Sequence, residues 1–531
     1  MTAVTQLTRR TVLRGAVAAA ASTLVTKHAA AMHPLARRRA TDPDRDALAE
    51  RAVDAARSAG ATYADARLTI TRRETPGLQD SEERAIGVRA LVNGYWGFAA
   101  SAVWTPDEAA RLAREAATQA AAHSRGGTRA VELGPPPTVR RGEWVMPVKY
   151  DPFDVSAWEK IDVMNAFASA VSDYRNGLSS NYSMNFMRQS SVFASTDGAS
   201  WAQTIYQSAA SFTLMYPDEY HAGLGMGAAA ANGLSPAGRG WELVSESNIV
   251  DAIPALAVEA ELSRHLVPFD IGRYDVVFSA EAMASLLDQT LAPAMELDRA
   301  LGYEANASGT SFLDAPLDML GAQVVASPLI TVTGNRSTPG GLATVRWDDE
   351  GIVPDDFTLV KDGVLVDYQT TREQAAWLAP YYQRTGRAVR SHGCAAGASG
   401  LVIPMQHAPN LALAPGAART TFDDLVAGTE KGIAVLSLNA NMDQQQLNGI
   451  GYGTMREIVR GKLGRYISGG AFMFRTPEFW KSVIAVGGPG TQQWFGRGHG
   501  KGEPRQSTWH SVAGIPAKVR QLSFVDPGRK A

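Results

Sequence analysis

The chain has 531 residues, of which 45% are hydrophobic and 20% are charged, and its formal net charge is −2. This length exceeds what one hydrophobic core usually covers, so we expect two domains. The near-neutral charge gives no electrostatic basis for a nucleic-acid partner. The single cysteine, Cys394, excludes an internal disulfide and a cysteine-rich metal site.

The first 31 residues have the order of a twin-arginine export signal. An arginine pair at positions 9 and 10 precedes a mildly apolar run and a candidate cleavage site at Ala29-Ala30-Ala31. The run is shorter than the roughly 20 apolar residues that a membrane-spanning helix needs. The alternative is a chance arginine pair before an alanine-rich tract. We expect a signal peptide over 1–31, a linker over 32–42, and a periplasmic or secreted mature protein with no membrane contact.

The N-terminal domain, over residues 43–266, is predicted to be a helix-flanked sheet. Thr105, Pro106 and Glu108 have the pattern of a helix start, with a cap, a first-turn proline and a capping box. Asn93-Gly94 between two apolar runs predicts a tight hairpin. Helical or alternating apolar spacing indicates helices near 44–58, 105–122 and 248–266 and strands near 63–72, 86–92, 95–100 and 179–215.

The C-terminal domain, over residues 267–531, is predicted to be β-rich around one helix that begins near Glu281. Short apolar runs separated by frequent Gly and Asp turns are typical of antiparallel strands. One turn, Asp348-Asp349-Glu350-Gly351, is predicted to be solvated. Three acids in a row also leave a cation site open as the alternative.

Several of these segments resemble the TldD/PmbA (modulator of DNA gyrase) metallopeptidases. TldD-type members carry Leu-Leu-His-Glu-x-x-x-His, a short acidic tail and Gly-Thr-Ser. The matching residues here are the Leu286-Leu287 frame, Glu296 and Asp298, and 309–311; the first hairpin, 87–101, and the acidic turn also match. The resemblance implies an α+β fold of two domains, action on peptides, and zinc as the family's metal.

The chemistry of the family's motif is missing from this chain. Asp288 stands where the first zinc-binding histidine would be, Gln289 where the catalytic glutamate would be, and Pro293 where the second histidine would be. The family's third ligand is a cysteine near the C-terminus, and His499 stands at the matching place. We therefore predict no metal, with Asp288 and His499 as the only weak candidates, and an unknown catalytic site.

The spacing of the family's two histidines also carries a geometric prediction. Five residues on a regular helix turn through about 500°, so the two side chains would lie roughly 140° apart. The helix must bend or bulge there for both to reach one ion. In this chain Pro293 removes a backbone N–H at the second position.

Other candidate groups are sparse. Cys394, two residues after His392, is expected to be buried and inert rather than a nucleophile. Glu296, Asp298 and Glu304 are expected to be solvated or salt-bridged rather than an acid pair. The sequence does not decide whether the C-terminal aromatic residues, Phe472, Phe474, Phe479, Trp480 and Trp494, line a peptide cleft or belong to the core. Seven histidines lie beyond the signal and linker: His123, His221, His265, His392, His407, His499 and His510.

Three functional hypotheses follow. The favoured one is an exported pseudo-peptidase: a zinc-less peptide-binding or partner subunit that forms a homo- or heterodimer with a TldD/PmbA-family relative in a peptide-processing complex. The family supplies a precedent, since TldD pairs with a zinc-less relative, PmbA. The second is an active peptidase with relocated catalytic or metal residues around Asp288, His499 or Cys394. The third is a binding or scaffold protein that keeps only the fold.

Overall fold

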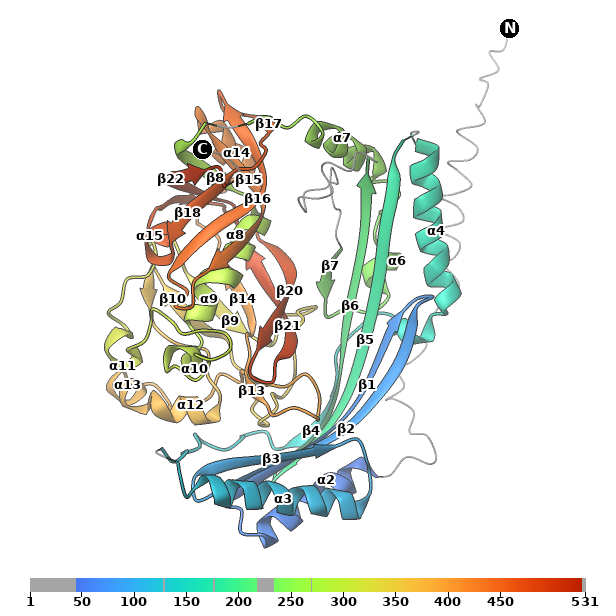
Figure 1. Cartoon of the computed structure of the whole chain (residues 1–531), viewed down its shortest axis with the longest axis vertical. Coiled ribbons are helices and arrows are strands. Elements are labelled where there is room, and N and C mark those ends of the chain that lie inside the picture. Colours follow the sequence, from blue (N-terminus) through green and yellow to red (C-terminus); the bar gives the residue numbers. More distant parts are fainter. Residues whose placement is uncertain (1–43, 128, 175–176, 217–233, 269, 528–531) are drawn as a thin grey trace.

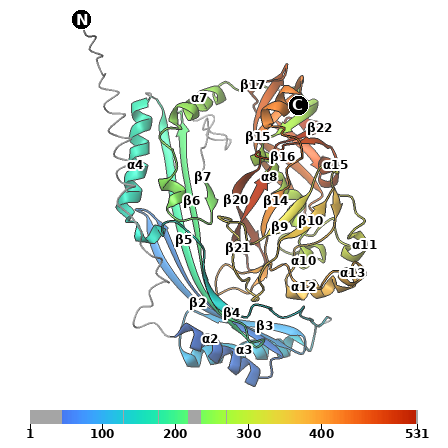
Figure 2. The same cartoon turned by 180° about the vertical axis from the view of Figure 1, so that it is seen from behind.

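The computed structural model describes residues 44–127, 129–174, 177–216, 234–268 and 270–527. The predicted signal peptide and linker lie outside this part of the chain. The described residues form two α+β domains, as the resemblance implied, and the long curved strands of the N-terminal domain face the C-terminal domain (Figures 1 and 2). No helix within the described ranges is long and apolar enough to cross a membrane.

The N-terminal domain is built on one seven-stranded sheet in the order β3-β2-β1-β5-β6-β4, with β7 paired to β6. Asn93 and Gly94, with φ of 52° and 79°, make the predicted tight turn between β2 and β3. The strands are β1 (Tyr63–Thr75), β2 (Gln79–Val92), β3 (Tyr95–Ser101), β4 (Arg141–Val145), β5 (Ser179–Ser195), β6 (Ser200–Met215) and β7 (Leu234–Ala237).

The helices of this domain cover one face of the sheet. Ala64, Ala66 and Leu68 of β1 pack in the core with α2 and α3, so the alternating residues Arg67 and Arg73 lie on the opposite face. The helices are α2 (Arg45–Ser58), α3 (Pro106–His123), α4 (Ala157–Tyr174), α6 (Glu242–Ser245) and α7 (Ile253–Ser263), with a 3₁₀ turn at Pro152–Asp154. The last predicted helix is shorter than expected, because Pro254 occupies its first turn.

The C-terminal domain contains two larger sheets. The first has the order β11-β10-β9-β14-β21-β20; the second has the order β15-β8-β22-β18-β16-β17, with β19 paired to β22. The strands are β8 (Gly272–Phe278), β9 (Val332–Asn335), β10 (Phe357–Lys361), β11 (Val364–Leu365), β12 (Ala395–Ala396), β13 (Met405–Gln406), β14 (Asn410–Leu413), β15 (Lys431–Met442), β16 (Asn448–Val459), β17 (Lys462–Tyr466), β18 (Ala471–Arg475), β19 (Val483–Val486), β20 (Gln493–Lys501), β21 (Gln506–Gly514) and β22 (Ala517–Val525).

The central helix, α8 (Ala280–Leu286), lies between these sheets. Gly514 of β21 allows the close approach, because a Cβ there would stand 1.8 Å from the carbonyl oxygen of Ala280. The other side of α8 meets β15, where the Ser279 hydroxyl donates to the Leu436 carbonyl at 2.6 Å. The remaining helices are α9 (Ala292–Ala294), α10 (Leu297–Ala300), α11 (Pro316–Met319), α12 (Arg372–Trp377), α13 (Ala379–Arg384), α14 (Phe422–Ala427) and α15 (Thr476–Lys481).

The C-terminal aromatic residues mostly belong to the core. Phe472, Phe474, Phe479 and Trp480 are all buried in the main hydrophobic cluster, whereas Trp494 is 37% exposed. The open question from the sequence is therefore answered in favour of packing for four of the five.

Candidate functional site

The helix that carries the degenerate motif changes its hydrogen-bond pattern at the motif. Ser279 caps α8 by accepting from Ala282 N at 3.1 Å. After Leu286 the chain makes a π-turn over Leu287–Leu291, in which Ala292 N donates to the Leu287 carbonyl five residues back. A π-turn links residues five apart, so positions 288 and 293 come closer to one face. The bulge that the spacing predicts is present, although the two histidines are not.

The degenerate positions are engaged by other parts of the protein. Asp288 Oδ1 accepts a hydrogen bond from His510 Nε2 at 2.8 Å. Gln289 accepts from the backbone N–H of Ala440 on β15, which fixes its amide as a structural tie. Pro293 stands in the first turn of α9 and offers no ligand atom.

His499, the other candidate ligand, points to different partners from those of Asp288. Its Nε2 lies 2.9 Å from Glu296 Oε1, and its Nδ1 lies 3.4 Å from His407 Nδ1. His407 Nδ1 also lies 3.0 Å from the Thr508 hydroxyl. Asp288 and His499, the two weak candidates for metal ligands, therefore do not contact each other. Asp288 pairs with His510, and His499 pairs with Glu296.

Three histidines nevertheless gather at this place. The ring of His499 is 5.5 Å from that of His407 and 5.9 Å from that of His510, between centroids. The pairing of His499 with Thr508 across the β20–β21 hairpin puts both side chains on one face, and His510, two residues after Thr508, shares it. That alternation was readable in the sequence once the hairpin was placed, but His407 comes from a distant loop and gave no local signal.

A buried ion network lies directly beside the histidines. Lys501 Nζ contacts Glu296 Oε2 at 2.9 Å and Asp298 Oδ1 at 2.7 Å, and Arg299 Nε lies 3.2 Å from Glu296 Oε2. All four side chains are nearly excluded from solvent. The sequence left two environments open for Glu296 and Asp298, solvated or salt-bridged. The structure shows that both carboxylates are salt-bridged and buried.

The electrostatics of this network settle two protonation states. Burial opposes the charge of Glu296, but Lys501, His499 and Arg299 together hold its pKa well below the usual range. Burial, the neighbouring His499 and Lys501 hold the pKa of His407 well below its usual value. At neutral pH Glu296 is thus ionised and His407 is a neutral imidazole.

The donor set does not fit the family's zinc ion. A zinc peptidase needs three protein ligands converging on one open position and a carboxylate to take the proton of water. Here Pro293 gives no donor, Gln289 cannot act as a base, and Asp288 is turned to His510. Over the described ranges, no group of three or more His, Cys, Asp or Glu side chains could hold a metal ion.

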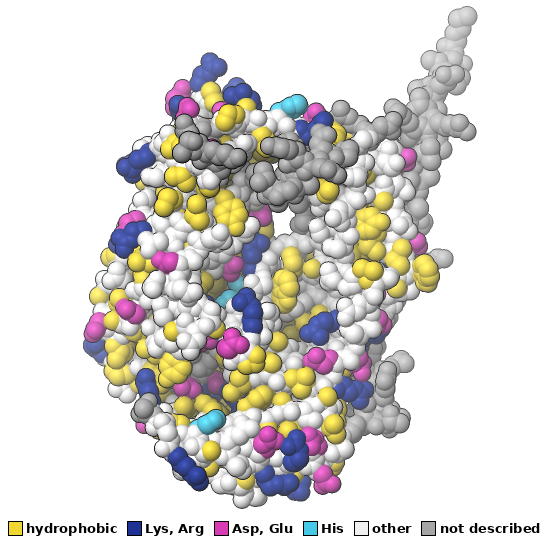
Figure 3. Space-filling model, viewed as in Figure 1, with side chains coloured by type: hydrophobic (Ala, Val, Ile, Leu, Met, Phe, Trp, Pro, Cys, Tyr) yellow, Lys and Arg dark blue, Asp and Glu magenta, His cyan; other side chains and the backbone are white. Residues whose placement is uncertain are grey.

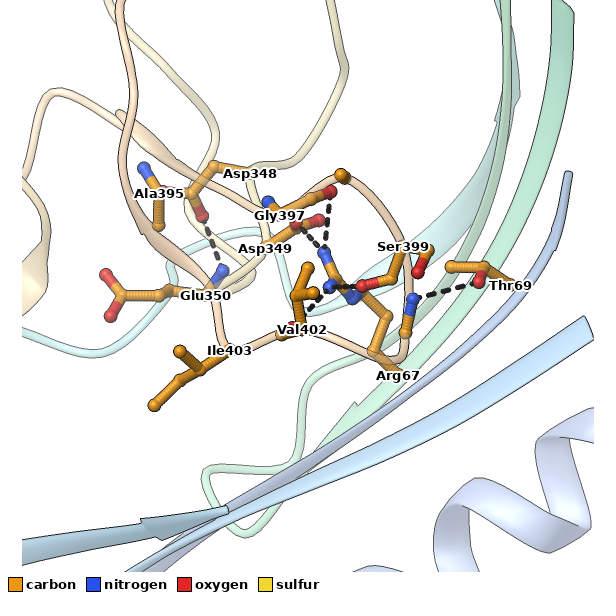
Figure 4. Close-up of polar contacts among 12 residues, drawn as sticks. Arg67, Thr69, Asp348, Asp349, Glu350, Ala395, Gly397, Ser399, Val402 and Ile403 are labelled. Atoms are coloured by element: carbon orange, nitrogen blue, oxygen red, sulfur yellow. Dashed lines mark hydrogen bonds and ion pairs between the residues drawn. The ribbon is translucent and has the colours of Figure 1, made fainter. Parts of the chain in front are cut away.

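The acidic turn is not solvated, which corrects the expectation from the sequence. Asp348 and Glu350 are 1% and 4% exposed. Asp348 accepts from the N–H group of Glu350 at 2.9 Å (Figure 4) and from that of Ile352 at 2.8 Å. Burial and the neighbouring Glu350 raise the pKa of Asp348 to about 7.

Two arginine side chains, rather than a bound metal cation, pair with the carboxylates of this turn. Arg67 of β1 forms an ion pair with Asp349, and Arg89 Nη1 of β2 lies 3.4 Å from Glu350 Oε1. These partners could not be predicted from the sequence, because the two arginines lie more than 250 positions earlier in the chain. The turn joins the two domains.

The thiol and imidazole near position 393 do not form a pair. Cys394 is fully buried, and burial raises the pKa of its thiol to about 12. These surroundings agree with the expectation that Cys394 is buried and inert rather than a nucleophile. His392 instead lies 2.9 Å from Asp355 Oδ1 and 3.1 Å from Asp367 Oδ2.

A pocket of about 360 Å³ opens between the two domains. One wall is the polar face of β1, β5 and β6, and the other is formed by Arg336, Asp349, the 396–398 loop and 507–509 of β21. Figure 3 shows the molecular surface hollowed between the two domains. Thr508 belongs to this wall and also contacts His407, so the pocket adjoins the histidine cluster.

Comparisons with known proteins agree with this architecture. The model of the PmbA/TldA metallopeptidase C-terminal domain matches residues 271–507, and that of domain 1 matches residues 65–120, together more than half of the chain. A metalloprotease of Methanocaldococcus jannaschii is 22% identical over 70% of this chain and 77% of its own length. A metalloprotease of Methanothermobacter thermautotrophicus is 26% identical over 70% and 75%.

Solved structures show the same fold. TldE from Thermococcus kodakarensis has a TM-score of 0.67 at 12% identity, covering 90% of this chain and 99% of that one. A putative modulator of a DNA gyrase from Thermotoga maritima has a TM-score of 0.65 at 14% identity, with coverage of 90% and 99%. The chain belongs to the TldD/PmbA metallopeptidase family.

Proposed function

We propose that this protein is an exported, zinc-less member of the TldD/PmbA family that binds peptides as the partner subunit of an intact, metal-binding relative. One observation carries the proposal: both surviving ligand-type residues, Asp288 and His499, are bound to other side chains of the protein, and Pro293 leaves the remaining position without a ligand. The likeness of the fold to that of TldE from Thermococcus kodakarensis also supports the proposal.

The first test is the metal content of the mature protein, purified without chelator and analysed for elements before and after zinc is supplied. We expect no stoichiometric zinc, because Pro293 offers no ligand atom and both Asp288 and His499 are bound to other side chains. One tightly held zinc per chain would overturn the proposal. A relative with an intact His-Glu-x-x-x-His motif, prepared in the same way, is the positive control.

The second test concerns the partner and the export route. A tagged copy should co-purify with an intact family relative from the periplasmic fraction of the source cells. Replacing both arginines of the signal, R9K and R10K, should leave the protein in the cytoplasm. Export that persists in this variant, or a purified protein that never associates with an intact relative, would contradict the corresponding part of the proposal.

A second candidate, a peptidase with relocated residues, is favoured by one specific observation. His407, His499 and His510 converge with Asp288 and Glu296 beside a pocket, although they form two dyads rather than one site. This candidate predicts chelator-insensitive peptide hydrolysis that is lost in H407A or H510A. Absence of turnover in the intact protein, tested against a mixed peptide library by mass spectrometry, removes it.

A further inference from the structure

The pocket between the domains has an unusual charge balance. Four charged residues line it: Arg73, Glu74, Arg336 and Asp349. Both acids already have cationic partners, since Glu74 Oε2 lies 2.6 Å from Lys160 Nζ and Asp349 pairs with Arg67. Within the described chain, neither Arg73 nor Arg336 has a carboxylate within ion-pair distance.

Arg336 is the more informative of the two arginines. It follows β9 and is 6% exposed, yet its guanidinium is held only by carbonyl oxygens: Nε donates to Ala343 at 2.8 Å, and Nη1 donates to Gly393 and Ala395 at 3.1 and 3.2 Å. Neutral acceptors fix its position without cancelling its charge. Burying a cation without a contacting anion costs free energy. A buried guanidinium is therefore usually paired with a carboxylate of the protein or with an anionic ligand.

Arg73 faces the same space from the opposite wall. It belongs to the set of alternate β1 residues, with Arg67, Thr69 and Thr71, that point away from the helix-covered core. Arg73 is exposed and pairs in register with Met187 of β5, which also lines the pocket. The two positive charges therefore come from different domains and share one pocket, and neither is in an ion pair with another described residue, although the nearby Asp348 acts electrostatically on Arg336.

The neutral lining is suited to a peptide chain. Asn185, Gln189 and Gln207 present amide side chains from β5 and β6, whereas the buried amide of Gln203 is bonded to the backbone of residues 346 and 347. Trp509 is 44% exposed on the facing hairpin. Amides both donate and accept hydrogen bonds, as a peptide backbone requires. A volume of about 360 Å³ is at the small end of ligand pockets, which suits a short peptide segment rather than a folded domain.

We propose that this pocket binds a peptide through a carboxylate that is held by Arg336 and Arg73, and thus selects acidic or free C-terminal peptide segments. The proposal rests on the peptide-binding part of the proposed function and names the substrate class of that protein. Arginine is suited to this task because its fork of donors can grip a carboxylate with two parallel hydrogen bonds.

The test uses four defined probes and the mature full-length protein. Tri-alanine with a free C-terminus is compared with its C-terminal amide, and acetyl-Ala-Glu-Ala-amide with acetyl-Ala-Gln-Ala-amide, by isothermal titration calorimetry and by Trp fluorescence. We expect at least one carboxylate probe to bind at least tenfold more tightly than its uncharged counterpart. A difference within the tri-alanine pair would indicate recognition of a C-terminal carboxylate. A difference within the Glu/Gln pair would indicate recognition of a side-chain carboxylate.

Matched variants connect the binding to the two arginines. R73Q and R336Q should each weaken the preferred probe by tenfold or more, and R336K should recover part of the loss because it keeps the charge. R51Q, an equal charge change on the exposed side of α2, is the control and should leave binding unchanged. Far-UV circular dichroism verifies that R336Q folds, and R73Q alters only an exposed strand residue.

The outcomes separate this inference from the proposal it rests on. Equal binding of charged and uncharged probes overturns carboxylate selection and leaves peptide binding intact. Carboxylate-selective binding that survives both R73Q and R336Q moves the site elsewhere and overturns the assignment of this pocket. Absence of binding by all four probes overturns the inference together with peptide binding, whereas the partner-subunit role is decided separately by co-purification.

Discussion

His392 lies between two carboxylates and an aromatic ring. Its ring stacks on Phe357 with centroids 4.1 Å apart, and its two nitrogens face Asp355 and Asp367. Burial opposes the charged imidazolium, but the hydrogen bonds to Asp355 and Asp367 outweigh it and raise the pKa of His392 to about 9. The imidazolium is therefore a structural cation at neutral pH.

This environment predicts a pH dependence of stability. A histidine whose pKa rises on folding stabilises the protein fully below its unfolded pKa of about 6.5, and the contribution disappears as pH rises through the folded value. Between about pH 6.5 and 9.5 the native protein should lose roughly 3 kcal/mol more unfolding free energy than H392Q. Urea titrations across that range measure it. Parallel pH profiles of the two proteins would contradict the assigned protonation state.

At the residue scale, the sequence showed which ligand types are missing, but it did not show which partners each side chain contacts. The loss of ligands at Asp288 and Pro293 was visible directly, because a zinc site depends on residue types. The partners were not visible: His510 lies 222 positions from Asp288, and Arg89 lies 261 positions from Glu350. A run of acids is solvated by default, and only the fold shows that arginines from another domain cover this one.

At the scale of elements, local patterns were reliable where backbone chemistry decides. The Asn93-Gly94 hairpin and the Thr105 cap occur as predicted, because each depends on neighbouring residues alone. The helix after Glu281 passes through a π-turn before Pro293, at the place where the spacing of the family's histidines calls for a bulge. That turn matches the five-residue spacing of the family's histidines, although the ligand residues are absent from this chain.

The retained π-turn predicts that zinc binding can be restored. The quadruple variant D288H, Q289E, P293H and H499C returns the family's ligand types to positions whose backbone is already bulged. We expect one zinc per chain by elemental analysis, against none in the parent protein. A matched variant with P293A in place of P293H lacks one ligand and should hold zinc substoichiometrically. If the quadruple variant folds but remains metal-free, the turn does not align positions 288 and 293.

At the scale of the whole molecule, buried ion pairs hold the two domains together. Arg67 of the N-terminal sheet reaches Asp349, and the same guanidinium donates to the carbonyl oxygens of Ser399 and Val402 (Figure 4). Gly400 N donates to Thr69 Oγ1 at 3.0 Å, so the loop around position 400 lies directly on β1. Asp349 also lines the pocket, so these contacts fix one residue of its wall against β1.

This arrangement predicts that the Arg67–Asp349 pair contributes far more than a surface pair on the same strand. The side chains of Arg67 and Asp349 are 5% and 15% exposed, whereas those of Arg72 and Asp80 are 32% and 56% exposed at a distance of 2.8 Å. R67Q should cost about 3–5 kcal/mol, because it leaves a buried carboxylate unpaired. R72Q should cost at most about 1 kcal/mol, because water screens that pair.

A double-mutant cycle separates the pair from the carbonyl contacts of Arg67. Unfolding free energies of R67Q, D349N and the double variant should give a coupling energy of about 0.5–3 kcal/mol, and the cycle with R72Q and D80N should give less than about 1 kcal/mol. Because the pair also sets the position of Asp349 in the pocket wall, R67Q should weaken binding of the preferred peptide probe while R72Q does not. Equal coupling in the two cycles would mean that the Arg67–Asp349 pair contributes no more than a surface pair, and would contradict its role in holding the domains and the pocket wall in place.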